Sequence, residues 1–350
     1  MDLPVPWPLA PMLAKAAKNV PDPGAVEGGY AYEPKWDGFR ALIGRDGDDL
    51  QIISRGGKDL GRYFPELLDA LPGLLPTRCV LDGEVVVRSG PPGSQRLDWE
   101  ALSARIHPAV SRINLLAEQT PAEFIAFDLA ALDGADLTGE PFRTRREHLA
   151  QALDTARPPL HLTRLTEDVE RARGWLHRFE GAGLDGIIAK AWQGTYQSGK
   201  RTMIKVKHAR TAEAVVVGYR IHKSGTGVGS LLLGMYTDSG ELVNVGGISA
   251  FTTARRAALI DELQPWVIRD DDGEAVLGET DRSRFSASKD VSFVRLRPER
   301  VVEVAFDQLE GDRFRHAVQF LRWRPDRDPR SATLDQVDRA MAYDLAEVLT

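Results

Sequence analysis

The stretch Glu33-Pro-Lys35-Trp-Asp37-Gly38-Phe-Arg40 (EPKWDGFR) joins two segments of strand-like composition, 30–35 and 39–45. Asp37-Gly38 is typical turn chemistry between strands. A lysine fixed beside such a turn can lie at the floor of a pocket, so Lys35 is a candidate nucleophile. A lysine nucleophile must lose a proton, and neighbouring cations would lower its free pKa of about 10.4. The alternative is an exposed lysine in a hairpin, because a K-x-D-G match alone is weak.

Two further lysines alternate in the downstream segment Ile204-Lys205-Val206-Lys207. Alternate residues of a strand point to the same face, so both ammonium groups are expected to project together. Such a pair would lower the pKa of a neighbouring lysine, and it also suits a polyphosphate. The alternative is a solvated strand edge, where lysines are common.

Carboxylates stand beside glycine in two apolar segments. Asp82 and Glu84 flank a glycine in LDGEV, and Asp185 precedes a glycine in DGIIAK. Hard divalent cations prefer such oxygen ligands, so the three carboxylates are candidates for a metal site. The alternative for either motif is an ordinary turn at the end of a strand.

Three further features carry weaker signals. Arg55 lies in SRGGK (54–58), which could hold a phosphate or a ribose or could simply form a glycine turn. Phe127 lies in an apolar strand-like run, where it is either core or an aromatic that stacks on a base. The glycine-rich run 225–229 has no helix after it, so a flexible hairpin is favoured over a phosphate loop.

The 350 residues are 43% hydrophobic and 27% charged, an ordinary globular composition that argues against disorder. This length predicts two domains or one large one. The single cysteine, Cys79, excludes an internal disulfide and a cysteine-based zinc site, and it fits a reducing compartment. The chain has no apolar run of about 18 residues and no convincing signal peptide. We therefore expect a cytoplasmic protein without a membrane span.

The net charge of −6 leans against a nucleic-acid binder. Two local clusters oppose this average, because residues 200–223 carry seven Lys and Arg side chains and residues 295–330 carry nine arginines. These clusters are compatible with a basic groove on an acidic body.

The pattern of predicted strands and helices changes after His208. Residues 1–208 combine short strands and turns with amphipathic helices, expected at 144–154 and 169–182. From 209 onward, strand-like segments between glycine turns indicate a small β-barrel-like domain. Helical periodicity at 331–349 predicts a terminal helix. The sequence thus predicts an α+β chain with domains at 1–208 and 209–350.

Seven motifs occur in a fixed order: EPKWDGFR, SRGGKDL, LDGEVVV, FIAFDL, DGIIAK, IKVK and FLRWRPDR. This set resembles the covalent nucleotidyltransferases and, within them, the ATP-dependent DNA ligases. The resemblance runs from about Pro11 to Arg330 and is nearest to small bacterial two-domain ligases, namely ligase C and the ligase module of ligase D. It implies a nucleotidyltransferase (adenylation) domain of mixed antiparallel sheets and helices, followed by an OB-fold β-barrel domain with a C-terminal helix.

The resemblance also implies a role for each matching residue. Lys35, with Asp37 in the same catalytic motif, would attack the α-phosphate of ATP and carry AMP. Glu33 would read the adenine amino group, and Phe127 would stack on adenine. The remaining matches are Arg40 and Arg55 for ribose or phosphate, Glu84 for ribose or metal, Lys205 and Lys207 for the α-phosphate, and Arg324, Asp326 and Arg327 for pyrophosphate.

A catalytic Mg2+ or Mn2+ is expected near Asp82, Glu84 and Asp185. The family usually has Glu where Asp185 stands, one methylene longer, and often Lys where Arg327 stands, with a different hydrogen-bond geometry. The implied substrate is nicked double-stranded DNA, sealed by a monomer that acts in DNA repair at the bacterial nucleoid.

Two alternatives stay open at this point. An RNA ligase or an mRNA guanylyltransferase would share the lysine chemistry, although Glu33 favours adenine and FLRWRPDR resembles DNA ligases. A non-catalytic nucleic-acid-binding subunit is opposed by the intact set of Lys35, Lys205 and Lys207.

Overall fold

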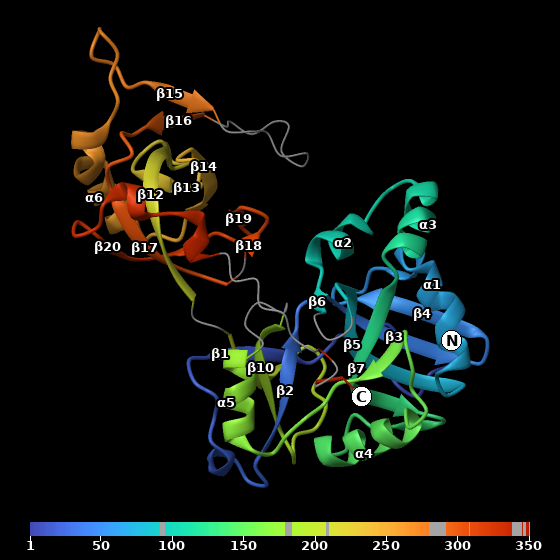
Figure 1. Ribbon diagram of the computed structural model, residues 1–350. Helices are drawn as coiled ribbons and strands as arrows, with labels where there is room; N and C mark the ends of the chain where they lie inside the picture. The colour runs from blue at the N-terminus through green and yellow to red at the C-terminus, as the bar shows by residue number, and fades with distance from the viewer. Residues whose placement is uncertain are drawn as a thin grey trace. The chain divides into compact units, whose positions relative to one another are not determined.

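The computed structural model (Figure 1) describes residues 1–91, 95–178, 184–207, 210–279, 292–307, 309–337, 345 and 348–349. Contacts between Cα atoms divide the chain into two compact units, Met1–His208 together with Ala340–Thr350, and Ala209–Arg339. The sequence analysis assigned 209–350 to the second domain, whereas residues 340–350 group here with the first unit.

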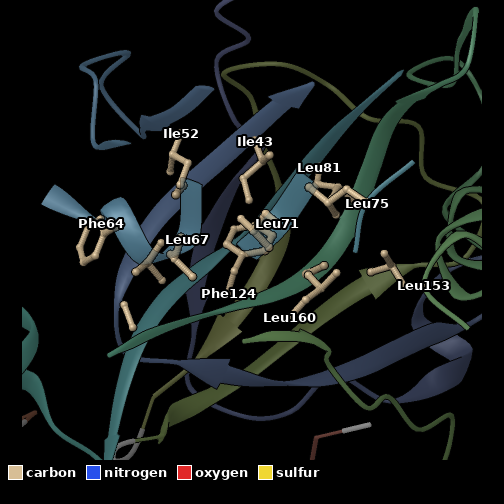
Figure 2. Packing of buried hydrophobic residues seen from close by; sticks show 14 of the residues in the cluster. Ile43, Ile52, Phe64, Leu67, Leu71, Leu75, Leu81, Phe124, Leu153 and Leu160 are labelled. Atoms are coloured by element: carbon tan, nitrogen blue, oxygen red, sulfur yellow. The ribbon is translucent and has the colours of Figure 1, made fainter. Parts of the chain in front are cut away.

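A seven-stranded sheet forms the larger half of the first unit. Its strands are β3 (Phe39–Asp46), β4 (Asp49–Ser54), β5 (Arg78–Ser89), β6 (Arg96–Leu97), β7 (Ala122–Leu132), β8 (Ala135–Asp136) and β9 (Leu160–Leu162). β4, β3, β5 and β7 lie side by side in this order and are antiparallel (Figure 1). β8 pairs antiparallel with β7, and β9 runs parallel to β7. Alternate strand residues such as Ile43, Leu81 and Phe124 pack against Leu67 and Leu71, as Figure 2 shows. This burial is the main hydrophobic stabilisation of the sheet.

A second, four-stranded sheet completes the first unit, in the order β1-β11-β10-β2. Its strands are β1 (Leu13–Ala17), β2 (Tyr30–Trp36), β10 (Leu184–Ala191) and β11 (Arg201–Val206). β1 runs parallel to β11, whereas β10 is antiparallel to both of its neighbours. This pairing places Glu33 of β2, Ile188 of β10 and Lys205 of β11 in one row across the sheet.

The EPKWDGFR stretch passes from one sheet to the other. β2 pairs with β10, and β3 pairs with β4 and β5, so the turn at Asp37-Gly38 is a crossing between two sheets, and the alternative of a hairpin is wrong. A Cβ atom on Gly38 would lie 2.2 Å from the carbonyl oxygen of Val85 on β5. Glycine is needed here because the backbone of the crossing lies directly against β5.

Short helices cover the sheets of the first unit. They are α1 (Pro65–Ala70), α2 (Trp99–Ala104), α3 (Val110–Gln119), α4 (Phe142–Ala152) and α5 (Val169–Arg178), with 3-10 turns at Pro23–Ala25, Gly61–Tyr63 and Leu71–Gly73. α4 and α5 match the helices expected at 144–154 and 169–182, although residues 179–182 lie outside the described part. Within the described residues, no helix is both long and apolar enough to cross a membrane.

The second unit is built on another seven-stranded sheet, which confirms the β-rich character expected after residue 208. Its strands are β12 (Arg210–Ile221), β13 (Val228–Tyr236), β14 (Leu242–Ile248), β15 (Leu277–Glu279), β16 (Ser292–Arg295), β17 (Val301–Phe306) and β20 (Gln319–Trp323). A small ribbon adds β18 (Leu309–Glu310) and β19 (Arg313–Phe314). The helix α6 (Thr253–Leu263) and the turn Gln264–Trp266 pack on the sheet, with Leu259 and Leu263 buried in the core.

The expected C-terminal helix is wrong for the residues that the structure describes. Only 3-10 turns occur at Pro329–Ser331 and Leu334–Gln336. Thr333 instead pairs with Tyr236 in a parallel bridge, and Ala332 accepts a hydrogen bond from the Tyr236 amide. These long-range bonds require extended backbone, so tertiary contacts override the helical periodicity. Residues 338–344 lie outside the described part.

Gly38→Ala should destabilise the first unit by about 1–3 kcal/mol, the cost of overpacking, because the new methyl group would collide with the Val85 carbonyl oxygen. Denaturant unfolding followed by circular dichroism would measure the loss. Gly56→Ala is the matched control, because a Cβ atom there meets nothing within 4 Å. Equal stability of the two variants would contradict the close approach.

Candidate active site

Lys35, near the end of β2, lies beside an acidic residue of the neighbouring strand. Its Nζ donates to Asp185 Oδ2 at 2.6 Å, and Lys207 Nζ lies 2.9 Å from the same oxygen. One carboxylate therefore holds two ammonium groups. Of these, Lys35 lies 150 residues from Asp185 along the chain. Asp185 is buried, while Lys35 keeps 21% of its side-chain surface exposed and is accessible to a substrate.

Lys205 belongs to the same group of charges. Burial lowers the pKa of Lys205, and the neighbouring Lys207 and Lys35 lower it further. The structure therefore brings together Lys35, Lys205 and Lys207, as the sequence analysis expected of a polyphosphate site. Three cations around one carboxylate leave an excess of positive charge that attracts phosphate.

A buried ion pair lies on the same sheet. Glu33 Oε2 is 2.9 Å from Lys190 Nζ, and both side chains are 3% exposed. Burial raises the pKa of Glu33, against the opposing effect of Lys190. Lys190 also donates to the Phe127 carbonyl oxygen at 2.7 Å, whereas Glu33 Oε1 is buried without a hydrogen-bond partner among the described residues. An unpaired buried carboxylate oxygen is costly, so a donor from a ligand fits there.

Lys190 received no role in the sequence analysis, although it ends the DGIIAK motif. Nothing in the local pattern shows that a lysine on a buried strand will pair with Glu33. The pairing arises because β10 is antiparallel to β2, with Ala189 opposite Tyr32 and Lys190 opposite Ala31.

Arg40 is held by an acid that was expected to bind metal. Its Nε and Nη2 donate to the two oxygens of Asp82, both at 2.6 Å, and the hydroxyl of Tyr196 donates to Asp82 Oδ2 at 2.6 Å. The guanidinium lies 4.4 Å from the centre of the Phe127 ring. Asp82 is fully buried, so in this structure it orients Arg40 against Phe127.

Glu84 lies two residues further along β5 and faces the crossing. Its Oε1 accepts a hydrogen bond from the Gly38 amide at 3.2 Å. Burial raises the pKa of Glu84 to about 7, even though Arg40 and Lys35 favour its charged form. Asp37 in the crossing raises the pKa of Glu84 as well, so Glu84 lies near both Lys35 and Asp37.

The predicted metal ligands do not converge. Among the described residues, no group of three or more His, Cys, Asp or Glu side chains is arranged to hold an ion. Asp82 is bound to Arg40, whereas Glu84 and Asp185 each interact with Lys35. Of the three predicted ligands, only Glu84 and Asp185 thus lie beside Lys35, where their carboxylate oxygens could bind an ion.

The remaining predicted site residues are Arg55 in the first unit and three charged residues in the second. The Arg55 amide donates to the Arg40 carbonyl oxygen at 3.2 Å, and its exposed side chain follows β4. Arg324, Asp326 and Arg327 follow β20 in the second unit, where Arg324 Nη2 donates to Asp326 Oδ2 at 2.8 Å.

Two family models match the chain. The ATP dependent DNA ligase domain matches residues 11–207, and the ATP dependent DNA ligase C terminal region matches residues 224–327. Together they match most of both units of the structure.

The chain is also similar to named relatives. It is 58% identical to DNA ligase C1 of Mycolicibacterium smegmatis over 100% of this chain and 99% of that protein. It is 31% identical to the multifunctional non-homologous end joining protein LigD of the same species, over 86% of this chain and 36% of that protein. A solved Lig E DNA ligase, 19% identical, covers 89% of this chain and 99% of its own with a TM-score of 0.56, which supports the fold alone.

The raised pKa of Glu84 predicts a pH-dependent stability. From the free value of 4.5 to about 7, the folded protein retains a proton that the unfolded chain releases, so stability falls as pH rises through this window. Glu84→Gln removes this loss, which is at most about 3 kcal/mol. Denaturant unfolding from pH 4.5 to 8 should show Glu84→Gln gaining stability relative to the parent. The exposed Glu147→Gln is the control, and parallel profiles for all three proteins would refute the assignment.

Proposed function

The chain belongs to the ATP-dependent DNA ligases, and we propose that it seals nicks in duplex DNA through AMP carried on Lys35. The observation that supports this most directly is the group formed by Lys35, Asp185, Lys205 and Lys207. It combines a nucleophile, a proton acceptor and counter-charges for a phosphate.

In the first step, Lys35 Nζ attacks the α-phosphorus of ATP, forming an N–P bond as the bond to pyrophosphate breaks. The Lys35 ammonium group must first lose a proton, and Asp185 Oδ2, at 2.6 Å, is an acceptor in contact with it. Lys205 and Lys207 lie near Lys35 and neutralise charge on the α-phosphate. The phosphoramidate then conserves the energy of the cleaved bond.

The adenine is recognised by the buried pair of Glu33 and Lys190. Glu33 Oε1, which lacks a hydrogen-bond partner among the described residues, accepts from the adenine amino group. Lys190 fixes the other oxygen of Glu33 and so sets the direction in which Oε1 points. Phe127 provides a ring beside which the base stacks, and Arg40 and Arg55 contact ribose or phosphate. An adenine amino group fits Glu33 where the guanine carbonyl oxygen does not, which disfavours a guanylyltransferase.

Glu84 and Asp185 are the residues that would hold a divalent cation, because hard ions prefer carboxylate oxygens and both acids interact with Lys35. Such an ion supplies electrostatic neutralisation of the phosphate oxygens during transfer. Displacement of the Lys35 and Lys207 ammonium groups from Asp185 would free its oxygens for this role.

AMP then passes from Lys35 to the 5′-phosphate of the nick, and the 3′-hydroxyl attacks that phosphate with release of AMP. The second unit and its basic side chains bind the DNA backbone, with Arg324, Asp326 and Arg327 orienting pyrophosphate in the first step only. The likeness to the end-joining protein LigD supports a role in DNA repair, in the cytoplasm at the nucleoid.

Lys35→Ala should take up no label from α-labelled ATP, because no other amine would occupy the position in line with the α-phosphate. Gel electrophoresis after incubation with ATP and a divalent metal measures the label, and a nicked duplex measures sealing. Lys58→Ala, an exposed lysine after the Arg55 turn, should label fully. Labelling of Lys35→Ala, or labelling by GTP in preference to ATP, would exclude the proposed chemistry.

Arg327→Ala should slow adenylation of Lys35 by about 10²-fold, the usual cost of losing transition-state positioning. The same variant should seal a nick that already carries AMP on its 5′-phosphate at close to the parent rate, because pyrophosphate has no part in that step. Single-turnover rates of the two reactions give the comparison. An equal loss in both reactions by a folded variant would mean that Arg327 is not specific to the first step.

A further inference from the structure

Arg324 and Arg327, which the proposed function assigns to pyrophosphate, share one carboxylate in the second unit. Glu213 Oε1 accepts from Arg324 Nη1, and Glu213 Oε2 accepts from Arg327 Nε at 2.6 Å. We propose that Glu213 is a positioning residue for adenylation, which sets the spacing and direction of the two guanidinium groups. This inference rests on the proposed role of the two arginines and adds the residue that organises them.

The sheet places Glu213 beside a second acidic side chain, so neighbouring cations stabilise it. On β12 it stands directly opposite Glu303 of β17, and Glu303 stands opposite Arg322 of β20. Two like charges opposite each other on neighbouring strands repel. Arg324 offsets this repulsion, because its Nη1 contacts Glu213 and lies 3.6 Å from Glu303 Oε2, which also accepts from Arg322 Nε at 2.6 Å. Arg324 is therefore attracted to a fixed point between two acids.

The backbone of Glu213 is also fixed. Its amide donates to Gln336 Oε1 at 2.8 Å, and its carbonyl oxygen accepts from Gln336 Nε2 at 2.8 Å. The neighbouring residues Ala212 and Ala214 are buried in the core, so the Glu213 side chain points to the opposite face. Only 13% of that side chain is exposed. A carboxylate held in this way has a defined position, and it therefore fixes the positions of the arginines that it binds.

The arrangement leaves the outer end of one arginine for a ligand. Arg327 is held through Nε, and no hydrogen bond of its two Nη groups occurs among the described residues. Its side chain is 42% exposed. Arg324 is bound on its other edge by Asp326, and this hydrogen bond lowers the pKa of Asp326 to about 2. Glu213 thus orients the free fork of Arg327, whose two donors match phosphate oxygens.

The test is Glu213→Gln, which keeps the size of the side chain but leaves one acceptor oxygen for two arginines. The rate of Lys35 adenylation at saturating ATP should fall about 10- to 100-fold, with a smaller change in KM, because the lost alignment acts on the leaving group. Sealing of a nick that already carries AMP should stay within about 3-fold of the parent, because pyrophosphate takes no part in that step. Glu213→Asp should recover part of the adenylation rate.

Glu299→Gln is the matched control, because it removes a carboxylate from an exposed arginine pair, Arg297–Glu299, in the same unit. It should leave both reactions unchanged. In the Arg327→Ala background, Glu213→Gln should slow adenylation by a smaller factor than it does in the parent, since residues that act together are not additive and only Arg324 then still depends on Glu213.

Three outcomes would overturn the inference. Parent-like or faster adenylation by Glu213→Gln, with Arg327→Ala impaired, would leave the proposed function intact and refute positioning by Glu213. Equal loss of both reactions by a folded Glu213→Gln protein would indicate a merely structural role. If Arg327→Ala itself loses both reactions equally, the step-specific role of the arginine fails, and the inference that depends on it fails too.

Discussion

The contact of Lys35 with Asp185 depends on the order of the strands in the small sheet of the first unit. Lys35, Lys205 and Lys207 repel one another, and one buried carboxylate on β10 offsets that repulsion. For this to occur, β10 must lie between β2 and β11, which is the order that the small sheet adopts. Asp185 is followed by Gly186, where a Cβ atom would lie 2.0 Å from the Val206 carbonyl oxygen. The glycine allows the close approach that brings the acid to the lysines.

The site around this contact is built from buried ion pairs. Glu33 with Lys190 is removed from water, and Asp82 is buried beneath a partly exposed Arg40, which costs free energy that their hydrogen bonds offset only in part. Such pairs fix the orientation of the groups before a substrate arrives. The carboxylate oxygen that is left unpaired at Glu33 is therefore informative, because a buried acceptor without a donor indicates where a ligand completes the network.

The same arrangement recurs in the second unit. There Glu213 binds Arg324 and Arg327, much as Asp185 binds Lys35 and Lys207 in the first unit. In both units an acid on a strand holds two cations that would otherwise repel each other. A polyphosphate substrate needs concentrated positive charge, and a folded domain tolerates that charge when a fixed carboxylate offsets part of it.

From the sequence alone, seven motifs in a fixed order determined the enzyme family and the fold class. Lys35, Lys205, Lys207 and Asp185 could be named as candidates because strand alternation and Asp-Gly chemistry are local and leave a pattern along the chain. Their predicted roles came from the seven motifs that resemble the ATP-dependent DNA ligases. The tertiary structure alone decided the partners of the charged groups. Asp82, expected near a metal, binds Arg40 across 42 residues, and Arg324 reaches Glu213 across 111.

The errors have the same cause. The turn predicted at Asp37-Gly38 joins strands of two different sheets. In the described part of the helix predicted at 331–349, up to residue 337, Thr333 forms a bridge with Tyr236 instead. Local propensity is worth at most about 1 kcal/mol per residue, so pairing between distant strands overrides it. Charge pairing across strands depends on register, and register is set by the packing of whole sheets, which no short motif encodes.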